Sequence, residues 1–239
     1  MILEKNKKTS QFFTFDENYN NLFELYEGWN NSILVKFNLN HEDTIDNLFF
    51  QKKIKKISNK EKILVVVSGG LEISKNGKKI ILREYDALNF NFYETNFKIK
   101  SLSNSLFYLV SSTIIPEKSL QGVYFNFKHD IPANDIWGGQ CISRPYVGRD
   151  LNLVLFDLKP GFKFEDSGHE NEQITWLIQG SMDFKCENLF NKLTIKNGVD
   201  IGPNHRHGGV SNGAVGFDAF FPKRQETEYK QKINSKKNF

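Results

Sequence analysis

The segment that decides the fold reads Gly168-His169-Glu170-Asn171-Glu172-Gln173-Ile174-Thr175-Trp176-Leu177-Ile178-Gln179-Gly180. It places a histidine and a glutamine at metal-ligand spacing, directly before an apolar strand that ends in glycine. Further along, the chain reads Pro203-Asn204-His205-Arg206-His207-Gly208. Because three of the five histidines fall in these two segments, the sequence indicates one common site.

Composition limits the size and the class of the protein. The 239 residues, with 22 Phe and 8 Tyr as core material, suffice for one large domain or two of roughly 100–120 residues. The two cysteines form no disulfide framework, so we expect a reducing, cytoplasmic location. No stretch approaches the ~20 apolar residues of a membrane span, and the start does not read as a signal peptide. The net charge of +4 comes mostly from lysines without interleaved arginines or aromatics, which predicts solvated surface and no nucleic-acid partner.

Short strand-like runs separated by Gly, Asn, Pro and Asp dominate the chain. Their spacing of roughly ten residues, with no helical repeat between them, predicts a β-sandwich or barrel. The runs are Ile63–Val67, Lys79–Leu82, Leu106–Ser111, Asn152–Leu158, Ile174–Ile178, Leu193–Lys196 and Gly216–Phe221. Residues Phe23–Trp29 are expected to form a short helix or an edge element.

Two parts of the chain repeat one pattern. Residues 62–69 match residues 173–180 in their apolar run and closing glycine. A repeat of about 110 residues predicts two copies of one β-barrel. The expected organisation is an N-terminal extension at 1–25, an N-terminal barrel at 26–118, a C-terminal barrel at 119–225 and a basic tail at 226–239.

The motifs resemble those of the cupin superfamily in its two-domain, bicupin form. The first cupin motif is represented by Gly161, Gly168, His169, Gln173 and Gly180, and the second by Gly198, Pro203 and His207. Over residues 150–225 the chain is also similar to the bicupin isomerases of bacilysin biosynthesis, through Gly180-x-Met182-Asp183 and Phe220-Phe221-Pro222-x-Arg224. The resemblance implies an all-β fold of two tandem cupin barrels, each a double-stranded β-helix or jelly roll.

The resemblance also implies a divalent transition metal as cofactor. Carried over position by position, the ligands are His169, Gln173 and His207, and Ser167 stands where the family has a further histidine. Imidazole nitrogens with an amide oxygen suit Fe, Co, Zn, Ni or Mn, so the identity of the metal stays open. A neutral glutamine leaves the ion a stronger Lewis acid, which favours polarising a carbonyl or enolate oxygen over redox chemistry.

Serine is a poor ligand for such an ion, so another group or a water must complete the shell. His205, Asp166 and Glu172 are the candidates, and His205 ranks first because imidazole matches the missing ligand best. In an extended strand alternate side chains share one face, so residues 167, 169, 171 and 173 are expected to point to one side. The two site histidines can also be hydrogen-bonded pocket residues around a vestigial site.

The leading functional prediction is a metal-dependent isomerase or proton-transfer enzyme acting on a small carboxylated, keto-acid or sugar-like metabolite. His205 and Glu172 are the candidate acid and base groups, although Glu172 also fits a solvated loop. Arg144 and Arg149 are the candidates for a substrate carboxylate, or for pairing with a nearby aspartate. Two alternatives stay open, an iron-dependent cupin oxygenase or lyase and a non-catalytic small-molecule-binding bicupin. We expect a homodimer, as the resemblance implies.

The N-terminal copy lacks the ligand pattern. Aligned on its closing glycine, it has Lys56, Ser58, Lys62 and Asn96 at the four ligand positions. A protonated lysine has no lone pair to offer a metal. We therefore expect this barrel to serve packing or dimerisation, and expect Trp176, on the opposite face from Gln173, to lie in a core or an interface.

Overall fold

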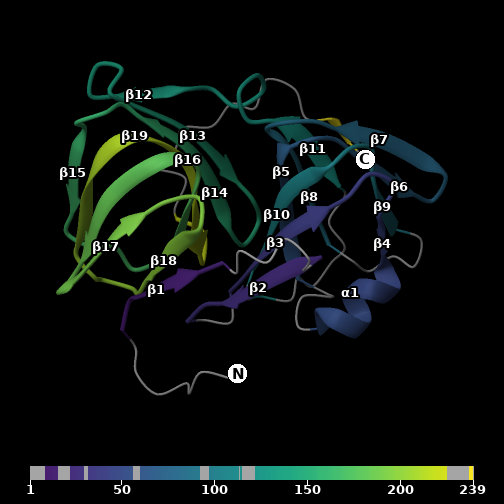
Figure 1. The fold of residues 1–239 in the computed structure, drawn as a ribbon, viewed down its shortest axis with the longest axis horizontal. Helices are drawn as coiled ribbons and strands as arrows, with labels where there is room; N and C mark the ends of the chain where they lie inside the picture. The colour runs from purple at the N-terminus through teal and green to yellow at the C-terminus, as the bar shows by residue number, and fades with distance from the viewer. Residues whose placement is uncertain are drawn as a thin grey trace.

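The computed structural model describes residues 9–15, 22–29, 32–55, 60–91, 97–112, 114, 122–224 and 237–238. Nearly all regular structure among them is β, with one helix, α1 (Asn47–Lys53), which confirms the predicted all-β class. The strands form a nine-stranded, a seven-stranded and a four-stranded sheet, arranged as two bodies (Figure 1). No helix in these residues has the length and apolar character needed to cross a bilayer.

The C-terminal body is built on the nine-stranded sheet. Two 15-residue strands, β16 (Glu172–Cys186) and β19 (His207–Phe221), pair along most of their length. Register shifts in this pair bend the sheet around an interior (Figure 1). The other strands are β1 (Gln11–Thr14), β12 (Asn134–Ile136), β13 (Cys141–Val147), β14 (Asn152–Leu158), β15 (Lys163–Asp166), β17 (Leu189–Leu193) and β18 (Asn197–Ile201).

Gly180 lies at the bend of β16. The sequence places it at the end of the strand, but β16 continues to Cys186. The residue has a φ of +75°, and a Cβ added there would lie 1.6 Å from the carbonyl oxygen of Gly213 on β19. Only glycine fits this position, so the closing glycine of the motif marks a bend rather than an end.

The N-terminal body joins the seven-stranded and four-stranded sheets through one apolar core. The larger sheet contains β2 (Phe23–Glu27), β3 (Ile33–Leu39), β5 (Glu61–Ser68), β8 (Asp86–Asn91), β10 (Ser105–Ser111), β11 (Val123–Asn126) and β20 (Lys237–Asn238). The smaller contains β4 (Thr44–Asp46), β6 (Leu71–Lys75), β7 (Lys78–Leu82) and β9 (Phe97–Ser101). Alternating buried residues of both sheets, such as Val35 and Ile73, meet in this core. Helix α1 adds Phe50 to it and is capped by Asp46, whose carboxylate accepts the Phe49 N–H at 2.8 Å.

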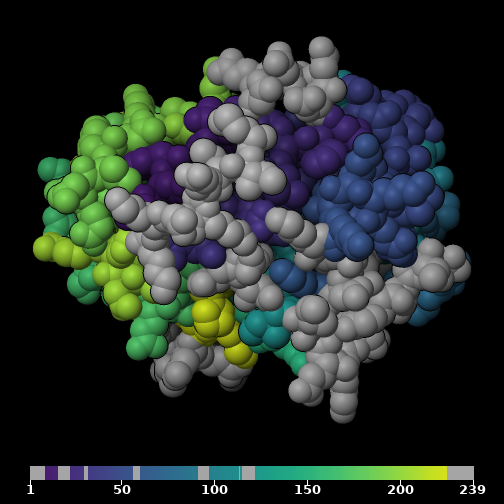
Figure 2. All heavy atoms as spheres, turned by 90° about the horizontal axis from the view of Figure 1, so that it is seen from below, coloured from purple at the N-terminus to yellow at the C-terminus, as the bar shows by residue number. Residues whose placement is uncertain are grey.

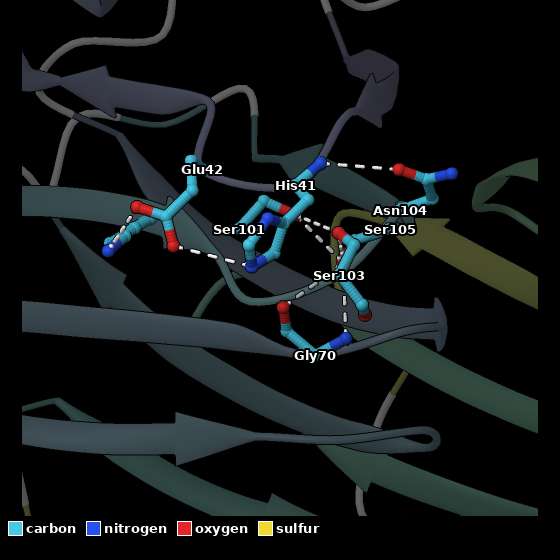
Figure 3. A network of polar contacts seen from close by, with 8 residues as sticks. His41, Glu42, Gly70, Ser101, Ser103, Asn104 and Ser105 are labelled. Carbon is cyan, nitrogen blue, oxygen red and sulfur yellow. Dashed lines mark hydrogen bonds and ion pairs between the residues drawn. The ribbon is translucent and has the colours of Figure 1, made fainter.

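A serine network closes the turn at the end of β5 (Figure 3). Ser105 Oγ accepts the N–H of Gly70 at 3.1 Å and donates to a carbonyl oxygen, and Ser101 Oγ lies 3.0 Å away. Gly69, the closing glycine of the N-terminal copy, has a φ of +81°. A Cβ there would lie 2.5 Å from the Asn104 carbonyl oxygen, so this turn also requires glycine.

The predicted strands agree with the structure except for one. Residues 193–196 were expected as a strand, but only Leu193 belongs to β17. Thr194 and Asn197 form a turn, in which the Thr194 N–H donates to the Asn197 side chain at 2.7 Å. Residues 23–27 form β2 at the edge of its sheet, which is the edge element that the sequence allowed.

Strand pairing crosses the domain boundaries that the sequence suggested. β1 lies in the predicted N-terminal extension but pairs with β18 of the C-terminal body. β11 lies beyond the predicted boundary at 118/119 but pairs with β8 of the N-terminal body. The predicted basic tail lies outside the described residues except for residues 237–238, which pair with β11.

The two bodies share a buried interface. Trp176 is fully buried there, with its ring 5.4 Å from that of Tyr108 and 5.5 Å from that of Phe217. Glu61 of β5 accepts the backbone N–H groups of Arg149 and Asp150 across the interface, at 2.9 and 2.6 Å. Burial raises the pKa of the Glu61 carboxyl. The position of Trp176 agrees with the expected core or interface role.

Candidate metal centre

Two histidines and an aspartate converge inside the C-terminal barrel. Asp166 ends β15, His169 lies in the following loop, and His207 begins β19. One ligand atom from each lies within 4.8 Å of those from the other two. Pairing of β15 with β19 places Asp166 directly opposite His207, which explains why residues distant in the sequence meet here.

The loop after β15 decides which side chains face inward. Gly168 has a φ of +102°, and a Cβ there would lie 2.6 Å from the backbone of Asn204. The Asn204 N–H donates to the carbonyl oxygen of His169 at 2.6 Å, which joins this loop to the one before β19. The expected alternation from residue 167 to residue 173 is therefore wrong, because the chain is not extended here. Ser167 is exposed, and Asp166 takes the inward position.

Gln173 lies beside the two histidines, as the sequence predicted. Its Oε1 is 2.9 Å from His169 Nε2. Its amide nitrogen donates to Thr175 Oγ1 at 2.9 Å and to Asp218 Oδ1 at 3.0 Å. These two acceptors orient the Gln173 oxygen toward His169 and away from the strand.

The donor set fits a divalent transition metal. His207 Nδ1 donates to the carbonyl oxygen of His205 at 3.0 Å, which leaves its Nε2 with a free lone pair. Burial is the main cause of the lowered pKa of His207. A lowered pKa favours the neutral imidazole, which is the form that binds a metal ion. Among the described atoms, buried His169 Nδ1 has no hydrogen-bond partner. Two imidazoles, a carboxylate and an amide oxygen suit Mn, Fe, Co, Ni or Zn.

His205 and Glu172 lie outside this donor set. His205 Nδ1 is 2.6 Å from Ser10 Oγ, so the structure places Asp166 and not His205 beside the two histidines. Glu172 is fully buried and accepts the Trp29 N–H at 2.9 Å and the Ser32 hydroxyl at 2.5 Å. The reason is strand alternation, because Glu172 and Gln173 are consecutive residues of β16 and point to opposite faces.

The two predicted substrate arginines do not line the interior cavity. Arg144 follows Ser143 on β13, and Ser143 is the one that faces the cavity. Arg149 lies 4.0 Å from Asp150 at the interface between the bodies, which corresponds to the structural alternative considered for it.

A cavity of about 230 Å³ lies next to the donor set. Its polar end includes Asp166, Gln173, Thr175, His207 and Asp218. The rest of its wall is mostly apolar, with Ser143 and Glu165 as its polar members, and its apolar part is formed by Ile136, Trp137, Cys141, Val154, Phe156, Leu158, Phe162, Phe164, Met182, Phe184 and Phe220. No lysine or arginine is among the described residues that line it.

Sequence reasoning missed Asp218. Its Oδ1 accepts the Thr175 hydroxyl at 2.6 Å as well as the Gln173 amide, and burial raises its pKa to about 6. The sequence did contain a signal for Asp218, because it is a lone carboxylate within the apolar run Gly216–Phe221. The sequence analysis correctly predicted this run as a strand. A charged residue inside a buried strand is a candidate for function because its burial is costly.

The N-terminal copy of the motif has a buried lysine, Lys62, at the position that Gln173 holds in the C-terminal copy. Lys62 is fully buried among the inward residues of β5, and burial lowers its pKa far below the usual value. Its amine donates to the carbonyl oxygen of Lys60 at 2.5 Å. Lys56, Ser58 and Asn96, the other residues aligned with the ligand positions, lie outside the described residues.

Comparison with known proteins identifies the fold. No protein family model and no curated protein sequence matches the chain. Among solved structures, protein Ylba from E. coli matches 94% of each chain with a TM-score of 0.72 at 13% identity. A mutant of Bacillus subtilis oxalate decarboxylase matches 90% of this chain and 78% of its own with a TM-score of 0.66 at 11% identity. AerE from Microcystis aeruginosa matches 90% of this chain and 97% of its own with a TM-score of 0.63 at 13% identity.

Proposed function

We propose that the C-terminal barrel is a metal-dependent proton-transfer enzyme, an isomerase of a small carbonyl compound. The all-β architecture and the cupin-type structural neighbours support this proposal, as does the position of the donor set beside a cavity of this barrel. The observation that carries the proposal is the position of Asp218, a half-buried carboxyl with a raised pKa that faces the same cavity as Asp166, Gln173 and His207.

His169, His207, Asp166 and Gln173 would hold the metal. Manganese is one precedent, because Mn(II) centres are described in Bacillus subtilis oxalate decarboxylase. When bound, the ion would act as a Lewis acid toward a carbonyl or enolate oxygen. The sequence similarity to the bacilysin bicupin isomerases around Met182 and Phe220 agrees with this chemistry.

Asp218 would accept a proton from a carbon next to the carbonyl group and return it to another carbon of the conjugated system. With a pKa of about 6, the Asp218 carboxyl is largely ionised at neutral pH. Its pKa is close enough to neutral pH for the carboxylate to take up a proton and release it again. Thr175 and Gln173 hold its Oδ1 by two hydrogen bonds, which leaves the other oxygen for the substrate.

The lining of the cavity restricts the substrate. An apolar body would pack against aromatic side chains such as Phe156, Phe162 and Phe220. A carboxylate in the cavity would find no arginine or lysine among its described lining residues and would face Asp218. We therefore favour a compact, largely apolar keto compound over a small dicarboxylate or a sugar.

An iron-dependent oxygenase is the second candidate. Asp166, His169 and His207 form a set of two histidines and one carboxylate, which are the residue types of the facial triad in non-haem Fe(II) oxygenases. In the sequence, the neutral Gln173 favoured Lewis-acid over redox chemistry. In the structure, Asp166 is a carboxylate that could complete a ligand set for iron.

The test is deuterium exchange. Protein loaded with Mn(II) or Co(II) is incubated in deuterated buffer with a panel of cyclic and aryl-substituted keto compounds, and exchange is followed by NMR. We expect Asp218→Asn to slow exchange by roughly 100-fold or more, and Glu84→Gln, an exposed acid on the other body, to leave it unchanged. Equal exchange in wild type and Asp218→Asn contradicts the assigned base, and oxygen uptake with Fe(II) in place of exchange supports the oxygenase.

A further inference from the structure

Residues from the N-terminal part of the chain reach both segments of the metal centre from outside the barrel. Strand β1 pairs with β18, and Ser10 precedes it directly. In the space-filling view the described N-terminal residues, in purple, lie between the green C-terminal body and the blue N-terminal body (Figure 2). These N-terminal residues contact Glu172, which precedes Gln173, and His205, which lies two residues before His207.

The first tie runs from Ser10 to His207. Ser10 is almost fully buried, and its Oγ accepts the Gly202 N–H at 3.0 Å. The same oxygen lies 2.6 Å from His205 Nδ1. His205 in turn provides the carbonyl oxygen that accepts the Nδ1–H of His207. Ser10 thus holds the short loop that determines which nitrogen of His207 faces the donor set.

The second tie runs from Trp29 and Ser32 to Gln173. Both donate to Glu172 Oε1, the Trp29 N–H at 2.9 Å and the Ser32 hydroxyl at 2.5 Å. Glu172 directly precedes Gln173 on β16. The Trp29 indole donates to the carbonyl oxygen of Thr9 at 3.1 Å, so the two ties are connected.

Trp29 also packs on the loop that Ser10 holds. Its ring lies edge-on to that of His205, with 5.8 Å between ring centroids. A Cβ on Gly202 would lie 2.9 Å from the indole, which shows how closely the ring covers the loop. The loop is therefore fixed by hydrogen bonds from Ser10 and by contact with Trp29.

We propose that Ser10, Trp29 and Ser32 form an N-terminal clasp that positions the metal ligands, with Ser10 acting through His205 on His207. Outer partners of metal-bound histidines set ring orientation and tautomer, and their loss typically weakens metal binding 10- to 100-fold. The clasp gives the segment from Ser10 to Ser32 a role in a site to which its described residues contribute no ligand. The inference depends on the proposed metal centre.

The test is the affinity for Co(II), titrated into chelator-treated full-length protein and followed by its visible absorption. We expect Ser10→Ala to weaken binding about tenfold, the lower end of the range because Ser10 acts one residue further out. Thr14→Ala is the matched control, since Thr14 is exposed at the far end of β1, the strand that follows Ser10, and this variant should bind Co(II) like wild type. Ser10→Cys conserves volume but is a poor hydrogen-bonding group, and it should behave like Ser10→Ala.

A measurement without metal separates this inference from the proposed function. Nitrogen-15 NMR of the imidazole rings should show His207 as the Nδ1–H tautomer in the wild type and as a mixture of tautomers in Ser10→Ala. Unchanged Co(II) affinity in both Ser10 variants, or an unchanged tautomer, overturns the clasp. Wild-type protein that binds no Co(II) but shows the tautomer change overturns the proposed function and leaves Ser10 as a positioning residue of a metal-free pocket.

Discussion

Replacing Asp200 with asparagine should remove a pH dependence of stability that the buried Asp200–Glu172 pair creates. Both side chains are fully buried, and Tyr26 donates its hydroxyl to Asp200 Oδ2 at 2.8 Å. Burial is the main cause that raises the pKa of Asp200 to about 8, and the neighbouring Glu172 raises it further. The pair therefore carries a shared proton at neutral pH. Asparagine can keep the contacts of this proton-bearing group without titrating.

The sign follows from the direction of the shift. A carboxyl with a folded pKa above its unfolded value of 3.8 contributes stability that is fully present below that value. This stability is lost as the pH rises through the folded pKa of about 8. At 1.36 kcal/mol for each pKa unit, the loss between pH 6 and pH 8 comes to about 2 kcal/mol.

The assay is urea unfolding of chelator-treated protein at pH 6 and at pH 8. Wild type should lose about 2 kcal/mol more than Asp200→Asn between these values. Glu84→Gln, which removes an exposed carboxylate, should follow the wild type. Parallel losses in wild type and Asp200→Asn would refute the assignment of a shared proton to this pair.

Two further substitutions test the interface and the site loop. Glu61→Ala leaves the buried N–H groups of Arg149 and Asp150 without their acceptor, so we expect a loss of about 3 kcal/mol in urea unfolding. A loss below about 1 kcal/mol would show that water replaces the carboxylate. Gly168→Ala should unfold more easily and bind Co(II) more weakly, because its Cβ meets the Asn204 backbone. Gly161→Ala is the control, with a similar positive φ but open space around it, and equal losses in both variants would contradict the steric argument.

The strands were predictable because their signals are local. Apolar runs bounded by turn residues identified β5, β10 and β14. Gly69 and Gly180, both with a positive φ, were recognised as the glycines that close the repeated pattern. The turn at Thr194 was missed because residues 193–196 have a strand-like pattern. In the structure the Asn197 side chain accepts the Thr194 N–H and so favours a turn over a strand.

The residues of the candidate metal centre were predictable only in part. His169, Gln173 and His207 were found from their spacing, and the structure brings them together. Asp166 ranked below His205 because an imidazole matches the missing ligand best. Alternation extended through Gly168 also put Ser167 on the inward face, whereas the left-handed backbone of Gly168 leaves Asp166 there. The clasp could not be predicted, since Ser10 and His205 are 195 residues apart and meet only through the pairing of β1 with β18.

The most direct test of the metal centre is the Co(II) content of untagged protein after loading and removal of excess ion. The wild type should hold about one ion per chain, and His207→Ala should lose it, because no other imidazole lies beside His169 and Asp166 among the described residues. His129→Ala, which removes an exposed histidine of the same chain, should keep it. Equal metal content in wild type and His207→Ala, or none in either, would contradict the centre.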